Sequence, residues 1–498
     1  MSAVARHAGL LLAAAYVLLG AAWLGANPPA TGPDEPEHYL WALSIGQGDF
    51  LGSATTDIPM RPQNPGQAHH LLRTTRSVAV PAGLSVPQSW FCTVLDHDAS
   101  ARCLDAAAPD PLPTHQSTYE ARYLPYVYAP VGLVMRLAHS ASAALALGRV
   151  ANFAMSFSLL VLAVLLLWDR RVPASLLGGI LALTPTVVFV GTVISPSGPE
   201  LAASAATLAF LLRLTREEPP PRWAWPLGIA AEGVLCLARP LGPIWLVVLV
   251  LCVALLNGRS RLVARLRSGK PWPAVGAGCI VAATILSLGW ELIVLPPETR
   301  DLSQLWGYLG PSVAAVPEAF GEAIGVFGWQ DTLMPRPAYA AWGIAMLLVV
   351  APALLRGRHR ERRGLDLVIV MVGTAIVVVS AAVELPTGFA VQGRHVLPII
   401  MAMLMVSGEI LYRNRGTRIS APTLGRLGAA SGGMVAAVQW LGWYSNAHRY
   451  AVGTAGPWWF LGTADWSPAG GWLPWAAFAL VAAVVMFLVA LSSGREAT

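Results

Sequence analysis

The residues best suited to acid and base chemistry form the stretch Gly-Pro-Asp-Glu-Pro-Glu-His-Tyr, directly after the first hydrophobic segment. Asp34 and Glu37 have the spacing of a capping box at a helix start, which gives Asp34 a structural interpretation besides a catalytic one. Capping does not account for Glu35, which a helix would place on one face with His38 and Tyr39. A carboxylate at a helix start beside a membrane can act as a general base, because burial raises its pKa while the helix end lowers it. We therefore expect Glu35, ahead of Asp34, to be catalytic, and His38 and Tyr39 to contact substrate.

Two arginines interrupt apolar segments at positions that suit an anionic ligand. Arg239 lies in Ala-Arg-Pro-Leu-Gly-Pro, and Arg394 lies in Val-Gln-Gly-Arg-His-Val-Leu-Pro. Each could simply anchor a helix at the membrane interface. A guanidinium is also a permanently charged fork that matches phosphate, and an arginine at a helix start opposes the helix dipole, so an anion should lie nearby. We expect both arginines to bind a donor phosphate.

Polar and aromatic residues in later segments are further candidates for contacts with the substrate. They are Arg122, Trp329, Gln330, Asp331, His448 and Arg449. An indole beside an amide and an acid suits sugar rings, although Trp329 could equally belong to the aromatic belt of the interface. Glu232 lies inside an apolar run, and Arg149 is one candidate partner for it.

The composition requires lipid as the main solvent. The chain has 498 residues, of which 55% are hydrophobic and 12% charged, and its mean hydropathy is +0.57. These values indicate a multi-pass membrane protein. The net charge is +6, but the basic residues form short runs between apolar segments, so they report topology rather than binding of nucleic acid. Cys92 and Cys103 lie in a long polar region, where a disulfide is expected, with a metal pair as the alternative.

Twelve apolar runs are long enough to span a membrane. They cover roughly 8–25, 144–167, 174–194, 199–214, 223–239, 241–256, 272–295, 336–356, 365–384, 395–412, 425–443 and 474–492. A further run, 122–139, is expected to be an interfacial helix outside the membrane with its tyrosines at headgroup depth, because the arginine clusters then fall on one side. Both termini are then cytoplasmic.

This topology predicts an all-α polytopic membrane protein with a large first extracytoplasmic loop. The expected parts are a first transmembrane helix (1–26), an extracytoplasmic loop with juxtamembrane helices (27–143), transmembrane helices 2–7 (144–295), a second extracytoplasmic loop (296–335), and transmembrane helices 8–12 (336–498) with a last loop (444–471). No glycine-rich phosphate loop follows a strand pattern, so an activated group must arrive in a form other than a nucleotide. No internal repeat of the kind found in many transporters is visible.

The order of these motifs along the chain resembles a bacterial family of predicted membrane proteins with a domain of unknown function. The motifs are Pro-Asp-Glu-Pro-Glu-His, Arg-Tyr-Leu-Pro, Ser-Pro, Ala-Arg-Pro, Phe-Gly-Trp-Gln-Asp and Gln-Gly-Arg. That family is similar to the GT-C glycosyltransferases, which include arabinosyltransferases, protein mannosyltransferases and the lipid A aminoarabinose transferase. The resemblance implies a GT-C-like bundle, a polyprenyl-phosphate sugar donor, and Asp34 and Glu35 as the acidic motif. Where the family tends to have Ser-Pro-Asp, this chain has Ser-Pro-Ser, so no metal cofactor is expected, and a divalent metal is doubtful.

The sequence thus predicts an inverting glycosyltransferase of the bacterial inner membrane with an extracytoplasmic active site. The expected partners are the polyprenyl-phosphate sugar, membrane lipid, and a glycan, lipid or protein acceptor. A transporter or flippase of lipid-linked oligosaccharides is the alternative from another class, and a polysaccharide polymerase or ligase is a closer one. A flippase would place its polar residues near the bilayer midplane, whereas here most lie at the edge.

Overall fold

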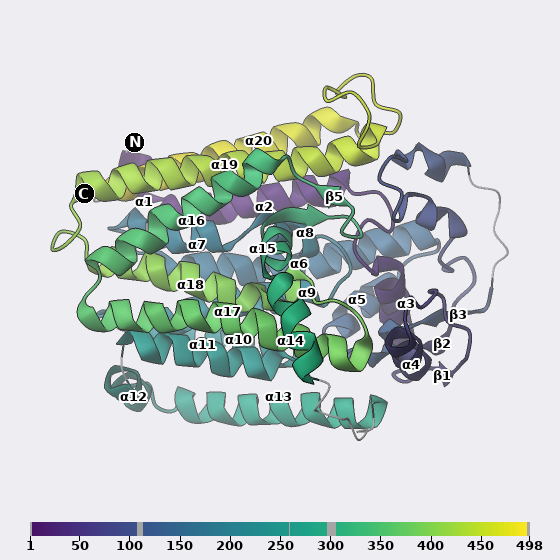
Figure 1. Ribbon diagram of the computed structural model, residues 1–498, viewed down its shortest axis with the longest axis horizontal. Coiled ribbons are helices and arrows are strands. Elements are labelled where there is room, and N and C mark those ends of the chain that lie inside the picture. Colours follow the sequence, from purple (N-terminus) through teal and green to yellow (C-terminus); the bar gives the residue numbers. More distant parts are fainter. Residues whose placement is uncertain (1, 107–112, 258, 296–304, 496–498) are drawn as a thin grey trace.

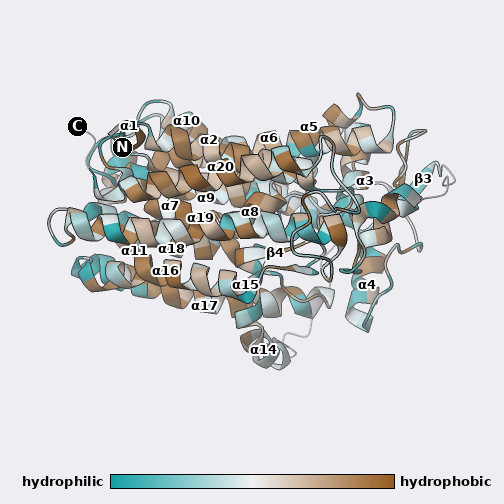
Figure 2. Ribbon diagram, turned by 90° about the horizontal axis from the view of Figure 1, so that it is seen from above, coloured by the Kyte–Doolittle hydropathy of each residue, from teal (hydrophilic) through white to brown (hydrophobic). Residues whose placement is uncertain are grey.

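The chain folds into a long bundle of helices with a smaller irregular part at one end (Figure 1). The computed structural model describes residues 2–106, 113–257, 259–295 and 305–495. We call the end that carries α3–α5 and β1–β3 the loop end. The opposite end, where α2 starts and α20 finishes, is called the basic end. Brown, hydrophobic residues dominate the length of the bundle in Figure 2, and teal residues gather toward its two ends.

The helices of the bundle have the following bounds. They are α1 (Ser2–Arg6), α2 (Ala8–Ala26), α6 (Ala141–Leu167), the 3-10 helix η4 (Pro173–Leu176), α7 (Leu177–Ala182), α8 (Pro185–Val190), α9 (Ser197–Thr215), α10 (Ala224–Ala238), α11 (Gly242–Asn257), α12 (Arg259–Ser268), α13 (Trp272–Val294), α16 (Arg336–Arg356), α17 (His359–Thr387), α18 (Gly393–Arg413), α19 (Ala421–Val452), α20 (Trp472–Leu491) and η6 (Ser492–Gly494).

The loop end combines short helices with a small antiparallel sheet. Its elements are α3 (Glu35–Gly46), β1 (Ser53–Ala54), α4 (Pro65–Thr74), β2 (Arg76–Ala79), η1 (Gln88–Thr93), η2 (Ala101–Ala106), β3 (His115–Thr118), η3 (Glu120–Arg122) and α5 (Tyr128–Met135). The strand order is β1-β2-β3, with Arg76 opposite Thr118. The sheet thereby brings the residues after β3 back to α3.

A second segment of short helices and strands follows α13. It contains α14 (Leu305–Ala314), α15 (Val316–Gly325) and a hairpin of β4 (Val326–Phe327) and β5 (Thr332–Leu333). Of the predicted loop 296–335, residues 296–304 lie outside the described residues. Helix α15 packs against α18, which brings this segment to the start of that helix.

Seven of the described helices are long and apolar enough to cross a membrane: Ala8–Ala26, Ala141–Leu167, Trp272–Val294, Arg336–Arg356, His359–Glu384, Gly393–Arg413 and Trp472–Gly494. The bent pair Gly242–Asn257 and Leu262–Ser268 would make eight if it is one span. The chain is therefore mostly helical with several possible spans, and the count of twelve stays a prediction.

Two predicted boundaries were wrong. The run 174–194 is not one helix, because it breaks between α7 and α8 before Pro185, whose ring cannot continue a helix from the preceding turn. There Thr184 caps α8 and donates its hydroxyl to the carbonyl of Ala323 at 2.7 Å. The loop expected to start at residue 444 starts later, because α19 continues to Val452.

The run 122–139 was expected to lie on the membrane surface, but it packs inside the loop end. Only α5, of eight residues, is a regular α-helix there, and it contacts α3 and α6. Tyr123 and Tyr128 are buried against other parts of the protein. At the α3–α5 contact, a side chain on Gly46 would collide with the backbone of Gly132, so this close approach requires glycine. It sets Tyr128 beside α3.

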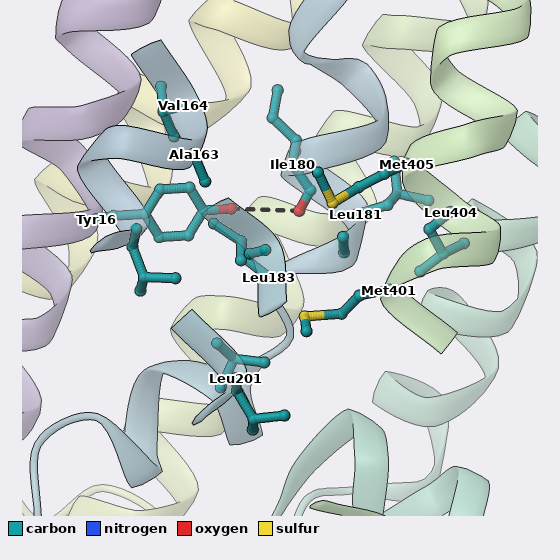
Figure 3. Packing of buried hydrophobic residues seen from close by; sticks show 14 of the residues in the cluster. Tyr16, Ala163, Val164, Ile180, Leu181, Leu183, Leu201, Met401, Leu404 and Met405 are labelled. Carbon is teal, nitrogen blue, oxygen red and sulfur yellow. Dashed lines mark hydrogen bonds between the residues drawn. The ribbon is translucent and has the colours of Figure 1, made fainter. Parts of the chain in front are cut away.

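The core of the bundle is a continuous set of buried apolar side chains contributed by most of its helices. Figure 3 shows one part of it, where the hydroxyl of Tyr16 reaches the carbonyl of Ile180 at 3.3 Å. That contact satisfies a carbonyl close to the break between α7 and α8, where backbone groups lose their helical partners. The helices α6, α9 and α18 run from the loop end to the basic end, and α9 and α18 carry charged residues at both.

Candidate functional site

Asp34 lies at the loop end, immediately before the first residue of α3. Its backbone is left-handed, with φ 59°, a conformation that aspartate tolerates better than most residues. Its carboxylate makes no capping bond, so the predicted capping box was wrong. Instead it accepts a hydrogen bond from the hydroxyl of Tyr119 at 2.7 Å and one from Nη2 of Arg394 at 3.4 Å. The left-handed turn thus points the carboxylate away from its own helix and toward α18.

Glu35, the next residue, is held in a different way. It is fully buried, and Arg149 of α6 donates to both its oxygens, at 2.7 and 2.6 Å. The backbone N–H groups of Ile194 and Gly32 donate to the same carboxylate at 3.1 and 3.3 Å. The other donors of Arg149 go to backbone carbonyls of the segment before α3. Arg149 therefore pairs with Glu35 and not with Glu232.

The hydrogen bonds to Glu35 determine whether its carboxylate can reach a ligand. Four donor contacts occupy its two oxygens, and its side chain is fully buried, so a substrate has no access to it. The side chain of Asp34 remains 20% exposed and its guanidinium contact is long. Of the two carboxylates, Asp34 rather than Glu35 is therefore open to a ligand, the reverse of the preference drawn from the sequence.

Arg394 has donors without partners. It sits in the first turn of α18, is 8% exposed, and pairs with Asp34 through Nη2 alone. Its Nε and Nη1 are buried and have no hydrogen-bond partner within the described ranges. Gly393 lets α18 approach α15 closely, and its N–H donates to Glu322. A buried unpaired donor is unfavourable, so these N–H groups suit an anionic ligand.

Arg239 lies at the end of α10 and is better satisfied. Its Nη1 donates to Glu200 of α9 at 3.3 Å, and its Nη2 donates to the hydroxyl of Tyr123 at 2.9 Å. The guanidinium also stands over the Tyr123 ring, 5.3 Å from its centre. That hydroxyl accepts a second bond from Arg122 at 3.2 Å. Tyr123 thus links two arginines on one wall of the site.

Arg122 and His38 complete the wall contributed by the first loop. Arg122 contacts Nε2 of His70 at 2.9 Å, and His38 contacts the hydroxyl of Tyr128 through Nδ1 at 2.8 Å. Burial, reinforced by nearby arginines, lowers the pKa of His38 well below its usual value. Its imidazole is therefore neutral at pH 7.

The remaining carboxylates of this region are buried with incomplete hydrogen bonding. One oxygen each of Glu37 and Glu120 has no hydrogen-bond partner among the residues described. Burial raises the pKa of Glu37 to about 8 and that of Glu120 to about 7. For Glu120, Nε of Arg122 lies 4.0 Å away. Both acids therefore hold their protons far more readily than a solvated glutamate.

One group of ligands here could hold a divalent cation. Asp34, His38 and Glu120 place one ligand atom each within 4.8 Å of one another, and carboxylate with imidazole suits several metals. Two guanidinium groups, Arg394 at 3.4 Å and Arg122 at 4.0 Å, already compensate these carboxylates. The same carboxylates therefore lie close to cationic side chains as well as to a possible set of metal ligands.

Several residues predicted to contact the substrate have other partners. Tyr39 is fully buried, and its hydroxyl donates to the carbonyl of Leu84 at 2.7 Å. Trp329 donates to the carbonyl of Ala30 at 2.8 Å, which ties the β4–β5 hairpin to the segment leading to Asp34. Gln330 has a left-handed backbone in that hairpin and lines a cavity beside α15. Trp329 therefore supports the site from outside, and Tyr39 belongs to the core.

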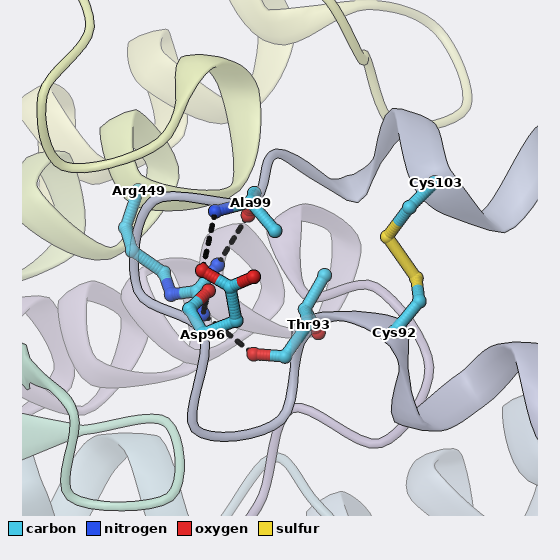
Figure 4. The surroundings of a disulfide bond; sticks show 6 residues. All are labelled: Cys92, Thr93, Asp96, Ala99, Cys103 and Arg449. Atoms are coloured by element: carbon cyan, nitrogen blue, oxygen red, sulfur yellow. Dashed lines mark hydrogen bonds between the residues drawn. A yellow bond between two sulfur atoms is a disulfide. The ribbon is translucent and has the colours of Figure 1, made fainter.

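Arg449, Asp331 and His448 form a second cluster, away from Asp34. The guanidinium of Arg449 donates to backbone carbonyls of Thr93, Asp96 and Ala99 at 2.6 to 2.8 Å, as Figure 4 shows. It also donates to Asp331 at 3.2 Å. His448 contacts two carbonyls of the following loop. These bonds fasten α19 to the disulfide-bonded loop.

The disulfide predicted between Cys92 and Cys103 is present in that loop (Figure 4). It joins η1 to η2, and the carbonyls bound by Arg449 lie between its two cysteines in the chain. The cross-link and the arginine together fix one segment of the loop end.

Several residues that bond to the predicted site residues or to their neighbours were not predicted from the sequence. They are His70, Tyr119, Glu120, Tyr123, Tyr128, Glu200 and Glu322. A usable signal existed for Glu200, because a carboxylate inside a predicted span requires a cationic partner. The others depend on how β3 and α5 fold back, which no local pattern reveals.

Comparison with known proteins identifies a family. Residues 17–403 match the family described as Predicted membrane protein (DUF2142). The match covers more than half of the chain, so the chain belongs to this family. No curated protein matches it. No solved structure matches it either.

Proposed function

We propose that this member of the family transfers a sugar from a polyprenyl-phosphate donor to an acceptor hydroxyl on a glycan, lipid or protein. Asp34 is the general base, and Arg394, supported by Arg239, binds the donor phosphate. The reaction takes place at the loop end, on the extracytoplasmic face of the bacterial inner membrane. The observation that carries the proposal is the pair of unpaired, buried N–H groups of Arg394 beside a partly exposed carboxylate.

A phosphate suits the unpaired donors better than a neutral ligand does. Nε and Nη1 of Arg394 are unpaired donors on two different edges of the planar guanidinium, and charged N–H groups of this kind bind phosphate oxygens strongly. Binding would remove the penalty of leaving the donors unpaired, about 1–3 kcal/mol or more for a charged group. Arg239 lies within the same set of charges but is already bonded to Glu200, so its contribution is smaller.

Asp34 is placed to accept a proton next to that phosphate. It takes the proton of the acceptor hydroxyl while the oxygen attacks the anomeric carbon. The bond from that carbon to the phosphate oxygen breaks, and its electron pair leaves with the phosphate, where Arg394 stabilises the added charge. Attack from the side opposite to the phosphate inverts the anomeric centre. The Tyr119 hydroxyl, 2.7 Å from Asp34, holds the base in position.

An apolar cavity next to α18 suits part of the lipid tail. Its volume is about 470 Å³, and Phe320, Ile324 and Leu333 are among its lining residues. Glu322, also in the lining, accepts from the N–H of Gly393, the residue before Arg394. Burying a chain there is favourable by about 0.8 kcal/mol for each methylene.

The alternatives differ in what they need from this site. A flippase of lipid-linked oligosaccharides would also use arginines facing a cavity, but it has no use for a carboxylate positioned as a base. A polymerase or ligase would use the same residues and differ mainly in the donor. Transfer of a radiolabelled sugar distinguishes a glycosyltransferase from a flippase. The length of the transferred glycan distinguishes it from a polymerase or ligase.

The experiment is transfer from radiolabelled polyprenyl-phosphate sugars by the full-length protein in proteoliposomes. Wild type should transfer label to an extracted envelope acceptor, and Arg394→Gln should lower the rate about 100-fold or more. Arg136→Gln is the matched control, because Arg136 is exposed in the same loop region. Equal rates for wild type and Arg394→Gln would overturn the proposal, and lipid movement without transfer would favour a flippase.

A further inference from the structure

A second concentration of charge surrounds a cavity of about 960 Å³ at the basic end. It forms where the ends of α6, α9 and α18 meet the start of α17, and we call it the basic cavity. Seven arginines line it: Arg170, Arg171, Arg213, Arg216, Arg358, Arg413 and Arg415. Four carboxylates line it as well: Asp169, Glu217, Glu218 and Glu361. The excess of arginine makes the cavity electropositive.

The inner part of the basic cavity is a saturated ion-pair network. Arg216 donates to Glu409 through Nε and Nη2, the shortest contact being 2.7 Å, and to a backbone carbonyl of α6 through Nη1. Arg413 donates to the same glutamate at 2.9 Å, and to Thr215 and Asn257. These two arginines have no spare donor group and serve the fold.

The rim has guanidinium groups that no carboxylate neutralises directly. They are Arg170, Arg171, Arg358 and Arg415. In the part of the chain that the structure describes, no carboxylate oxygen lies within 4.0 Å of any of them. The nearby acids have other partners, since Asp169 accepts from the hydroxyl of Tyr412 and Glu361 accepts from Asn414, both at 2.7 Å. The rim is therefore the part of the cavity open to an anion.

Apolar and aromatic side chains form the rest of the lining. They are Leu10, Leu165, Leu166, Val172, Trp168, Trp223 and Tyr412, with prolines of the α9–α10 connection. Arg170 stands over Trp168 at 5.6 Å, and Arg415 over Tyr412 at 4.3 Å. Leu10 is 53% exposed on the outside of α2, so the apolar wall reaches the outer surface of the bundle. A ligand that fits has an anionic head and an apolar body.

We propose that the basic cavity binds the phosphate headgroup of an anionic membrane lipid. Arg170 and Arg171 contact the phosphate, and the acyl chains lie along Leu10 and the end of α6. Basic pockets between membrane helices at the cytoplasmic side bind such lipids, and the predicted topology puts this end in the cytoplasm. The inference goes beyond sugar transfer, because the cavity and the Asp34 site lie at opposite ends of α6, α9 and α18.

The test is native mass spectrometry of the full-length protein in a neutral detergent. Dioleoylphosphatidylglycerol and dioleoylphosphatidylcholine are titrated separately, and inorganic phosphate is added as a competitor. The variant is Arg170→Gln with Arg171→Gln, since both side chains are exposed and their loss should leave the fold intact. The matched control is Arg360→Gln with Arg363→Gln, two exposed arginines near the same end but outside the cavity lining.

The proposal expects wild type to bind the glycerol lipid about tenfold more tightly than the choline lipid, and the variant to lose most of that preference. The control pair should stay within about twofold of wild type. Equal binding of the two lipids, or an equal loss in the control, would overturn it. Complete displacement by inorganic phosphate would assign the cavity to a soluble anion instead. Transfer activity does not enter these outcomes, so the two proposals fail independently.

Discussion

Two neighbouring carboxylates, Asp34 and Glu35, each face an arginine from a distant helix, and the two pairs are built differently. In the Glu35–Arg149 pair, the closest N···O distance is 2.6 Å and both side chains are buried. Two backbone N–H groups also donate to the Glu35 carboxylate. The Asp34–Arg394 pair meets at 3.4 Å, is partly exposed, and leaves two donors of the arginine unpaired. A saturated pair can only hold the chain in place. An unsaturated pair can bind something else, so function is expected where hydrogen bonding is incomplete.

The largest expected effect comes from breaking the saturated pair. Glu35→Gln or Arg149→Met leaves one charge buried without its partner, which destabilises a fold by about 3–5 kcal/mol. Thermal unfolding of the detergent-solubilised protein should show a strong fall in Tm or a loss of folded yield. Asp34→Asn is the matched control and should change the Tm little. A stable Glu35→Gln protein that lacks activity would reverse the roles of the two carboxylates.

The next effect concerns the two arginines assigned to the phosphate. Arg394→Lys removes both unpaired N–H groups and should weaken binding of a polyprenyl phosphate about 10- to 100-fold, because an ammonium cannot place donors at the same two positions. Arg239→Lys should weaken it less, since Arg239 is already bonded to Glu200 and Tyr123. Scintillation proximity with labelled lipid phosphate measures both. Equal losses would mean that the unpaired donors are irrelevant.

The sequence anticipated part of this site for physical reasons that can be named. Placing an arginine inside an apolar segment costs free energy, so such a residue is expected to have a specific role. This reasoning selected Arg239 and Arg394. The Cys92–Cys103 disulfide followed from two cysteines in a polar loop. The preference for Glu35 over Asp34 was reversed, because the surroundings of the two carboxylates depend on a left-handed turn at residue 34 and on Arg149, 114 residues away.

The fold was predicted correctly where local sequence determines it and incorrectly where distant contacts do. Long apolar runs predicted the helices of the bundle, since burial follows local composition. The break before Pro185 and the buried path of residues 122–139 were not predicted, because both depend on packing against distant elements. Tyr123 and Tyr128 were read as interfacial for that reason, whereas their hydroxyls bond to Arg239 and His38.

Glu37 is a third carboxylate of the same motif. Among the described residues, no ion pair with an arginine is found for it. Burial raises its pKa from 4.5 to about 8. A raised pKa in the folded state gives stability at low pH that is lost as the pH rises toward 8. The wild-type Tm should therefore fall by roughly 5 °C between pH 5 and pH 9 from this group, and Glu37→Gln should reduce that fall. An unchanged pH profile in the variant would show that Glu37 is not the titrating group.

The smallest expected effect is that of metal removal. Arg394 and Arg122 already face Asp34 and Glu120, so EDTA should change the rate of sugar transfer by less than about twofold. The rate is compared before and after chelation in the same proteoliposomes. A loss that Mn²⁺ restores would assign Asp34, His38 and Glu120 to a cation and remove Asp34 from the role of a free base.

The most direct test of the central claim is the transfer rate of Asp34→Asn, measured together with its affinity for the polyprenyl phosphate. The amide keeps the shape of the side chain but cannot take a proton, so the rate should fall about 100- to 10,000-fold. Folding and lipid affinity should stay within about threefold of wild type. Transfer at the wild-type rate would contradict the account, because Asp34 would then be no more than a residue at the start of a helix.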